Sequence, residues 1–274
     1  MKKQEISYFL RRLGLAKVAD QIRYYLLFLK KLKKNNQFRK LHPGLSIPPP
    51  YLMYESFQMD IARYFTAGKE DAQEIIEAVR PYVELHGKNI LDWGCGPGRI
   101  IRHMPDLLGN SNEYFGTDYN VMTVEWCREH LKGIQFSHNS VSPPFHFPEN
   151  NFELIYGISI LTHLSEENQL LWSKELQRLI SPTGIVYLTT HGEAFKEILT
   201  DNEVKLFEND KLVARTNVIE GHRMYGAFHP PLYIKKIFKD AGFKVMEHLA
   251  GSRVHEKYIS QDIWLLKKEE LIKD

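Results

Sequence analysis

The chain of 274 residues is long enough for one large α/β domain with an extension, or for two small domains. Its apolar content of 43% and charged content of 26% exclude a chain that is disordered throughout. Two cysteines are too few for a disulfide framework, and Arg11 and Arg12 interrupt the first apolar cluster, where a signal peptide would lie. These features together favour a cytoplasmic protein.

The positive charge is concentrated near the start of the sequence. Residues 1–40 hold 12 Lys/Arg and 2 Asp/Glu, whereas the rest of the chain holds 24 and 32. Apolar residues repeat at helical spacing within this segment: Ile22, Leu26, Leu29 and Leu32. We therefore expect one or two amphipathic helices over 3–35, with Gly14 as the point of separation between two pieces. Their cationic face is either simply solvated or attracts an anionic membrane surface, a nucleic acid or an acidic partner.

Prolines interrupt the helical pattern at residues 48–50, because proline fixes φ and lacks an amide donor. Helices are expected to resume over 52–66 and 69–85. This pattern predicts a basic helical extension and lid over 1–68, followed by the main domain over 69–274.

From residue 88 onward, short strands alternate with helices. The expected strands cover 88–92, 113–117, 134–138, 152–157, 184–190, 243–249 and 261–267. The expected helices cover 98–108, 120–132, 166–180 and 231–241. Alternation of this kind builds right-handed βαβ units, and it predicts a mostly parallel seven-stranded sheet with helices on both faces. Residues 200–228 are expected to form an insertion with a hairpin that turns at Asn209-Asp210.

A glycine-rich turn follows the first strand, with the sequence Leu91-Asp92-Trp93-Gly94-Cys95-Gly96-Pro97-Gly98-Arg99. Glycine lets the backbone approach a ligand closely, and the carboxyl ends of parallel strands are where open α/β sheets bind ligands. A dinucleotide site would need a third glycine where Arg99 stands, and a P-loop would need Gly-Lys-Ser/Thr. The turn resembles motif I of the class I methyltransferases that depend on S-adenosylmethionine (SAM).

This resemblance implies a Rossmann-like class I methyltransferase fold that binds SAM and releases S-adenosylhomocysteine (SAH). It implies that Asp118, at the end of the second strand, hydrogen-bonds both ribose hydroxyls, since a carboxylate has two acceptor oxygens. Tyr119 would flank the adenine, and Asp92 would lie near the SAM amino group. The other implied cofactor contacts are Gly94, Cys95, Gly96 and Gly98 in the turn, Asn139 and Ser140 after the third strand, and Gly157 and Ile158 after the fourth.

Methyl transfer is an in-line displacement for which an enzyme mainly supplies positioning, and a hydroxyl acceptor also benefits from a base. Histidine suits that role near neutral pH. Candidate bases are His163, His191 and His229, each in a loop expected at the ligand-binding edge. Tyr54 is expected in a lid over the cofactor, and Tyr51 beside the acceptor. No spacing typical of a metal site appears, so no metal is expected.

The predicted function is SAM-dependent methyl transfer to a hydroxyl of a small molecule or of a glycan or lipid-linked precursor. The chain is loosely similar to methyltransferases of bacterial surface-polysaccharide synthesis. The alternatives are a nucleic-acid methyltransferase that uses the basic arm, a SAM-binding regulatory protein without catalysis, and a dehydrogenase. The predicted location is the cytoplasm, with peripheral attachment to the inner membrane face through residues 1–40 as a further hypothesis.

Overall fold

The structure of the protein is a computed structural model that describes residues 15–216, 218–255 and 258–269. The part of the expected amino-terminal helices over 3–14, and the break expected at Gly14, lie outside the described residues.

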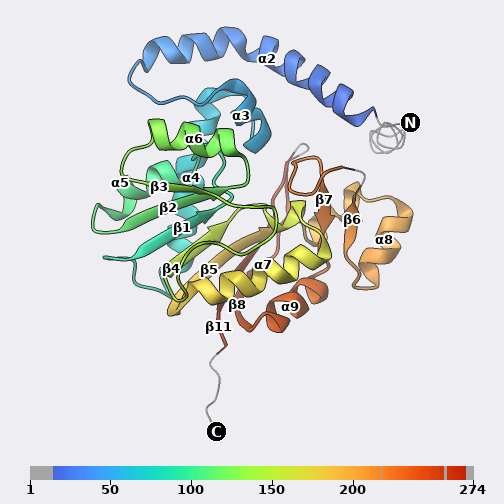
Figure 1. Ribbon diagram of the computed structural model, residues 1–274. Coiled ribbons are helices and arrows are strands. Elements are labelled where there is room, and N and C mark those ends of the chain that lie inside the picture. Colours follow the sequence, from blue (N-terminus) through green and yellow to red (C-terminus); the bar gives the residue numbers. More distant parts are fainter. Residues whose placement is uncertain (1–14, 217, 256–257, 270–274) are drawn as a thin grey trace.

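A seven-stranded sheet forms the centre of the molecule, with the order β3-β2-β1-β4-β5-β11-β8 (Figure 1). Its strands are β1 Asn89–Trp93, β2 Glu113–Asp118, β3 Gln135–His138, β4 Phe152–Gly157, β5 Ile180–Thr190, β8 Phe243–Leu249 and β11 Asp262–Lys268. Strands β3, β2, β1, β4 and β5 pair in parallel, and β11 runs antiparallel to both of its neighbours. The predicted mostly parallel seven-stranded sheet is therefore confirmed.

Helices cover both faces of this sheet, and each face has its own apolar core. One core joins β1 to α4 (Ile61–Val79), η1 (Ile101–His103), α5 (Met104–Leu108) and α6 (Val121–His130). The other joins the sheet to η2 (Leu161–His163), α7 (Glu166–Leu179) and α9 (Pro231–Asp240). Ile90 belongs to the first core and Leu91 to the second, because successive side chains of a strand point to opposite faces.

The helix expected over 98–108 begins later than predicted. Gly98 has a φ of +70°, outside the helical region, and the turn continues to Ile100 before η1 and α5 follow. The glycine-rich turn therefore continues two residues beyond its last glycine, Gly98.

The segment before the sheet differs from its expected form. Helix α2 (Ala16–Leu41) continues past residue 35, and α3 covers only Pro50–Ser56. The helices expected over 52–66 and 69–85 are wrong at their boundary, because the Asp60 side chain accepts a hydrogen bond from the Arg63 amide and starts α4 at residue 61. Figure 1 shows α2 along the outside of the molecule, beyond α3. Among the described residues, no helix is both long and apolar enough to cross a bilayer.

The hairpin expected at Asn209-Asp210 is also wrong. Thr200 and Glu203 form a capping box that starts α8 (Asp201–Glu208), and the Asn-Asp pair ends this helix. The hairpin strands are instead β6 (Val213–Arg215) and β7 (Gly226–Phe228), which pair antiparallel across a ten-residue connection. Of the other short elements, η3 (Glu193–Ile198) precedes this insertion, and β9 (Arg253–His255) and β10 (Tyr258–Ile259) pair with each other between β8 and β11.

Candidate active site

A cavity of about 790 Å³ lies at the carboxyl ends of β1, β2, β4 and β5. This volume is within the usual range for sites that enclose a small molecule or a cofactor. Its walls combine the glycine-rich turn, strand-end residues, part of α3, and residues from the second half of the chain: Gly221, Arg223 and the segment 258–261.

The glycine-rich turn supplies one wall because its backbone crosses the end of β2. The amides of Gly94 and Cys95 both donate to the Thr117 carbonyl oxygen, at 2.8 Å each. Gly94 has a φ of +74°, and a Cβ there would stand 2.1 Å from a side-chain carbon of Ile160. Gly96, with a φ of +51°, would bring its Cβ within 2.9 Å of Ser56 in α3. Two positions of this turn therefore require glycine.

The residues expected in the turn do not all reach the cavity. Gly94, Cys95 and Gly96 line it, whereas Gly98 is absent from its walls and packs against Leu131. Gly157 likewise does not line the cavity, because it lies against the Trp93 ring, while its neighbour Ile158 does. These two glycines support the wall from behind.

Asp118 joins the turn to the end of β2. One carboxylate oxygen accepts from the Gly96 amide at 2.9 Å, and the other accepts from the Asn120 amide at 2.8 Å. The residue lines the cavity, and burial raises the pKa of its carboxyl to about 6. Each oxygen has a second lone pair, so the carboxylate can still accept two further donors.

Asp92 is a second buried carboxylate in the cavity wall. Burial raises its pKa to about 7, and this effect exceeds the opposing effects of the Tyr156 hydroxyl and the Arg99 guanidinium nearby. The Tyr156 hydroxyl has no hydrogen-bond partner of acceptable geometry, so it lies close to Asp92 without binding it well. A cation placed in this cavity would favour the ionised form of Asp92.

Tyr119, Asn139 and Ser140 line the side of the cavity beyond β2. The Asn139 amide nitrogen donates to the Ser140 carbonyl oxygen at 2.7 Å, and its Oδ1 atom is buried without a partner. A buried acceptor without a donor is costly, so this atom is suited to a ligand amine.

His163 and His191 line the cavity, and main-chain carbonyls fix their tautomers. Nδ1 of His163 lies 2.8 Å from the Tyr225 carbonyl oxygen, and Nδ1 of His191 lies 3.1 Å from that of Ala227. A carbonyl only accepts, so Nδ1 carries the proton in each ring and Nε2 keeps its lone pair. Burial lowers the pKa of His163, and it lowers the pKa of His191 to about 3.

His229 is not brought to the cavity. Its ring is fully buried, neither ring nitrogen has a hydrogen-bond partner of acceptable geometry, and it is absent from the cavity walls. Burial lowers its pKa to about 3, although the carbonyls of His191 and Leu161 nearby favour the charged form. The structure thus places His229 where it cannot touch a ligand in the cavity.

The two tyrosines of α3 have different positions. Tyr54 lines the cavity, whereas Tyr51 is 45% exposed and does not line it. The Tyr54 hydroxyl donates to Asp20 of α2 at 2.7 Å, and its ring lies 4.0 Å below the Arg223 guanidinium carbon.

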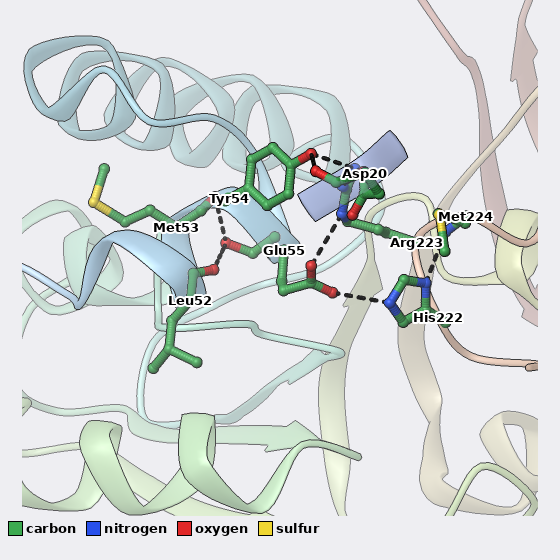
Figure 2. A network of polar contacts seen from close by, with 9 residues as sticks. Asp20, Leu52, Met53, Tyr54, Glu55, His222, Arg223 and Met224 are labelled. Carbon is green, nitrogen blue, oxygen red and sulfur yellow. Dashed lines mark hydrogen bonds and ion pairs between the residues drawn. The ribbon is translucent and has the colours of Figure 1, made fainter. Parts of the chain in front are cut away.

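Arg223 lines the cavity and links three segments of the chain through the polar contacts drawn in Figure 2. Its guanidinium donates to Asp20 of α2 and, at 3.1 Å, to Glu55 of α3. His222 adds a second contact to Glu55, at 3.4 Å. Glu55 and Arg223 both line the cavity, yet neither was predicted. No sequence signal marks them, because an isolated arginine in an irregular insertion resembles any solvated arginine.

A closed ring of hydrogen bonds lies in the part of the cavity wall that follows β4 and the end of β5. The Ser159 amide donates to Thr189 Oγ1 at 2.8 Å, Thr189 Oγ1 donates to Gln261 Oε1 at 2.5 Å, and Gln261 Nε2 donates to Ser159 Oγ at 2.8 Å. Ser159 has a φ of +65°, a strained conformation that tends to occur at functional sites. All three residues line the cavity. Their shared position at strand ends is the signal that could have found them.

These features fit a nucleoside-containing cofactor with an amino-acid tail. Asp118 offers acceptors to vicinal hydroxyls, Asn139 offers an acceptor to an exocyclic amine, and Asp92 offers an anion to an ammonium group. The same cavity continues to two neutral imidazoles.

Comparisons with known proteins agree with this geometry. Residues 90–184 match the family model described as a methyltransferase domain. The chain is 27% identical to the phosphoethanolamine N-methyltransferase of Plasmodium falciparum, over 70% of this chain and 68% of that protein. It is also 27% identical to the malonyl-[acyl-carrier protein] O-methyltransferase of Legionella pneumophila, over 52% of this chain and about half, 49%, of that protein.

A solved structure shares the fold. The glycopeptide N-methyltransferase MtfA complexed with SAM superposes with a TM-score of 0.53 at 12% identity, covering 73% of this chain and 94% of that one. The matched domain model covers the sheet from β1 into β5, including the glycine-rich turn and Asp118. Residues 90–184 therefore form a methyltransferase domain, and the sheet that contains them has the fold of methyltransferases that use SAM as their cofactor.

Proposed function

We propose that this protein transfers a methyl group from SAM to a hydroxyl of a small molecule, with glycan or lipid-linked precursors as the favoured acceptor class. The observation that carries the proposal is the pair of neutral imidazoles, each with a free Nε2 lone pair, in the cavity that also holds Asp92 and Asp118. A hydroxyl is a weak nucleophile until it loses its proton, so it needs such a base more than a neutral amine does.

In this proposal Asp118 binds the ribose hydroxyls, Tyr119 and Asn139 contact the adenine, and Asp92 pairs with the amino group. The backbone of Gly94 and Gly96 lies against the amino-acid tail, and a Cβ at either position would press on Ile160 or Ser56 of the cavity wall. SAM supplies an electrophilic methyl group on its sulfonium. The chain supplies orientation, exclusion of water and acceptance of one proton.

His163 is the better of the two candidate bases. The pKa of His191 is lowered to about 3, which makes it a poor proton acceptor near neutral pH. The pKa of His163 is also lowered by burial, and a main-chain hydrogen bond opposes that effect in both rings, but the neighbouring His229 and His163 lower the pKa of His191 further. We therefore assign the acceptor proton to Nε2 of His163, and to His191 a contact with the acceptor.

The relatives support methyl transfer but differ in acceptor. One acts by its name on phosphoethanolamine at nitrogen, and the other on malonyl-[acyl-carrier protein] at oxygen. An amine acceptor is therefore the second candidate function. It requires the same cofactor contacts but a weaker dependence on a base, because an amine with its lone pair free attacks without further deprotonation.

The test combines product identification with a variant that separates catalysis from structure. The purified chain is incubated with isotopically labelled SAM and three acceptor sets: hydroxylated sugars including lipid-linked ones, phosphoethanolamine, and malonyl-[acyl-carrier protein]. Mass spectrometry then identifies the methylated atom. Label on a hydroxyl oxygen supports the proposal, and label on nitrogen or on a carboxylate overturns the choice of acceptor.

His163→Asn tests the base directly. The asparagine amide can still donate to the Tyr225 carbonyl, but it has no Nε2 to accept a proton. We expect kcat to fall by about 10²-fold or more with SAH affinity retained. His191→Asn, which preserves the donor to Ala227 in the same way, is the matched control with a smaller expected loss. If His163→Asn kept full kcat, the role of His163 would be structural.

A further inference from the structure

Helix α2 has two apolar faces, and only one of them packs against the protein. On the inner face, Phe38 stacks on Phe65 of α4 with ring centroids 6.1 Å apart, and Tyr24 contacts Tyr54 of α3 at 5.3 Å. Lys31 and Lys34 pair with the buried Asp60 at 2.9 and 2.8 Å. These contacts fix the helix in its orientation along most of its length.

The opposite face of α2 carries a stripe of exposed apolar side chains. They follow helical spacing and are each between 53% and 65% exposed: Val18, Ile22, Tyr25, Leu26 and Leu29. Residues spaced three and four apart lie on the same side of a helix, so the stripe is continuous. A continuous apolar stripe of this kind on the surface marks a site for another molecule or for a membrane.

The charges of α2 indicate which kind of partner fits. Asp20 is the only acid in the helix, and it is engaged by Tyr54 and Arg223 on the inner face. The exposed cations of the helix include Lys17, Arg23, Lys30 and Lys33, and helical spacing places Lys30 and Lys33 nearest the apolar stripe. An acidic surface is therefore attracted, whereas a second copy of α2 would place like charges against each other.

We propose that the outer face of α2, defined as Val18, Ile22, Tyr25, Leu26 and Leu29 with the flanking cations, binds the surface of an anionic membrane. The helix lies in the interfacial plane, inserts the apolar stripe among the lipids and directs Lys30 and Lys33 toward the headgroups. This binding is independent of the proposed reaction. It brings the wall of the cavity formed by Tyr54 and Arg223 next to the lipid headgroups, because both residues bind Asp20 of the same helix.

The experiment is vesicle co-sedimentation of the full chain with neutral phosphatidylcholine vesicles and with vesicles that also contain phosphatidylglycerol. We expect binding to the anionic vesicles that weakens as salt is added, and little binding to the neutral ones. The double variant Leu26→Gln/Leu29→Gln should weaken binding by at least about tenfold, because two apolar side chains lose their insertion.

The matched control is Leu232→Gln in α9, where the leucine is 62% exposed on another side of the protein. It should bind vesicles like the parent chain, and circular dichroism verifies that all variants keep their helices. Equal binding to neutral and anionic vesicles, no binding, or unaffected binding by the double variant would each overturn the proposal. So would a dimer in light scattering that the double variant abolishes without any effect on vesicles. SAH affinity, measured in parallel, reports separately on the cofactor site.

Discussion

The two halves of the cavity are held together in different ways. The half around Asp118 is built from strand ends, where backbone amides of Gly94, Cys95 and Gly96 are fixed by main-chain and carboxylate acceptors. The half around Arg223 is built from helices and an insertion, and the Arg223 side chain joins them through Asp20 and Glu55. Backbone contacts at strand ends follow from the fold, whereas side-chain contacts between distant segments are particular to this chain. We therefore expect the first half to set cofactor affinity and the second to set access.

The largest effect is expected from Asp118→Asn. The amide keeps one oxygen acceptor but replaces the other with a donor, so it cannot accept from both Gly96 and Asn120 and also from two ribose hydroxyls. Loss of two hydrogen bonds to a charged acceptor predicts SAH binding weaker by roughly 100-fold or more. Calorimetric titration with SAH measures this change.

Asp106→Asn is the control, because this carboxylate is exposed on α5 away from the cavity. It should bind SAH like the parent chain. Thermal unfolding of both variants distinguishes lost contacts from a misfolded turn. Unchanged affinity in Asp118→Asn would contradict the division of the cavity described above.

Sequence reasoning reached the first half of the cavity and missed much of the second. A buried strand, a glycine-rich turn and an acid at the next strand end are local patterns, and the parallel topology brings them together at one edge. Asp92, Asp118 and the turn were found in this way. Gly98 and Gly157 were expected at the same surface but pack behind the cavity wall, because a pattern cannot distinguish a glycine that lines a cavity from one that packs behind it.

The second half depends on contacts between residues far apart in the sequence. Arg223 and Asp20 are about two hundred positions apart, and nothing local to either residue marks the other. The expected hairpin at Asn209-Asp210 failed for a related reason, since a turn-forming pair also suits the end of a helix that a capping box begins. His229 was chosen for its place in a loop, but burial, which a sequence does not reveal, removes it from the cavity.

A smaller effect is expected from pH, acting through Asp92. Its pKa is raised to about 7 by burial, so the unliganded protein holds this carboxyl partly protonated near neutral pH. An ammonium group pairs with the ionised form, so affinity for SAH should increase as pH rises through 7. If only the ionised form binds well, the gain is roughly tenfold between about pH 6 and pH 7.5.

Asp92→Asn isolates this contribution. The variant should bind SAH more weakly at pH 7.5 and show a flatter profile, because no carboxyl titrates at that position. Calorimetry at several pH values measures both chains. Equal slopes in the two chains would assign the pH dependence to another group, with Asp118 the first to examine, since its pKa is raised to about 6.

The smallest effect on SAH binding is expected from Arg223→Ala. This variant tests whether the half of the cavity around Arg223 controls the access of SAH. The change removes the contacts to Asp20 and Glu55 and the packing over Tyr54. SAH should dissociate roughly threefold to tenfold faster in stopped-flow measurements, with a smaller change in the association rate.

Arg215→Ala is the matched control. Arg215 forms two hydrogen bonds with Glu203, of 2.8 and 2.9 Å, and its guanidinium carbon lies 4.9 Å from the centre of the Phe228 ring, outside the cavity walls. Both variants should lose stability, about 1–3 kcal/mol each, because each leaves a carboxylate without its partner. Only Arg223→Ala should speed the release of SAH. If both variants released SAH at the parent rate, Arg223 would be a structural link between α2, α3 and the insertion, and access to the cavity would depend on other contacts.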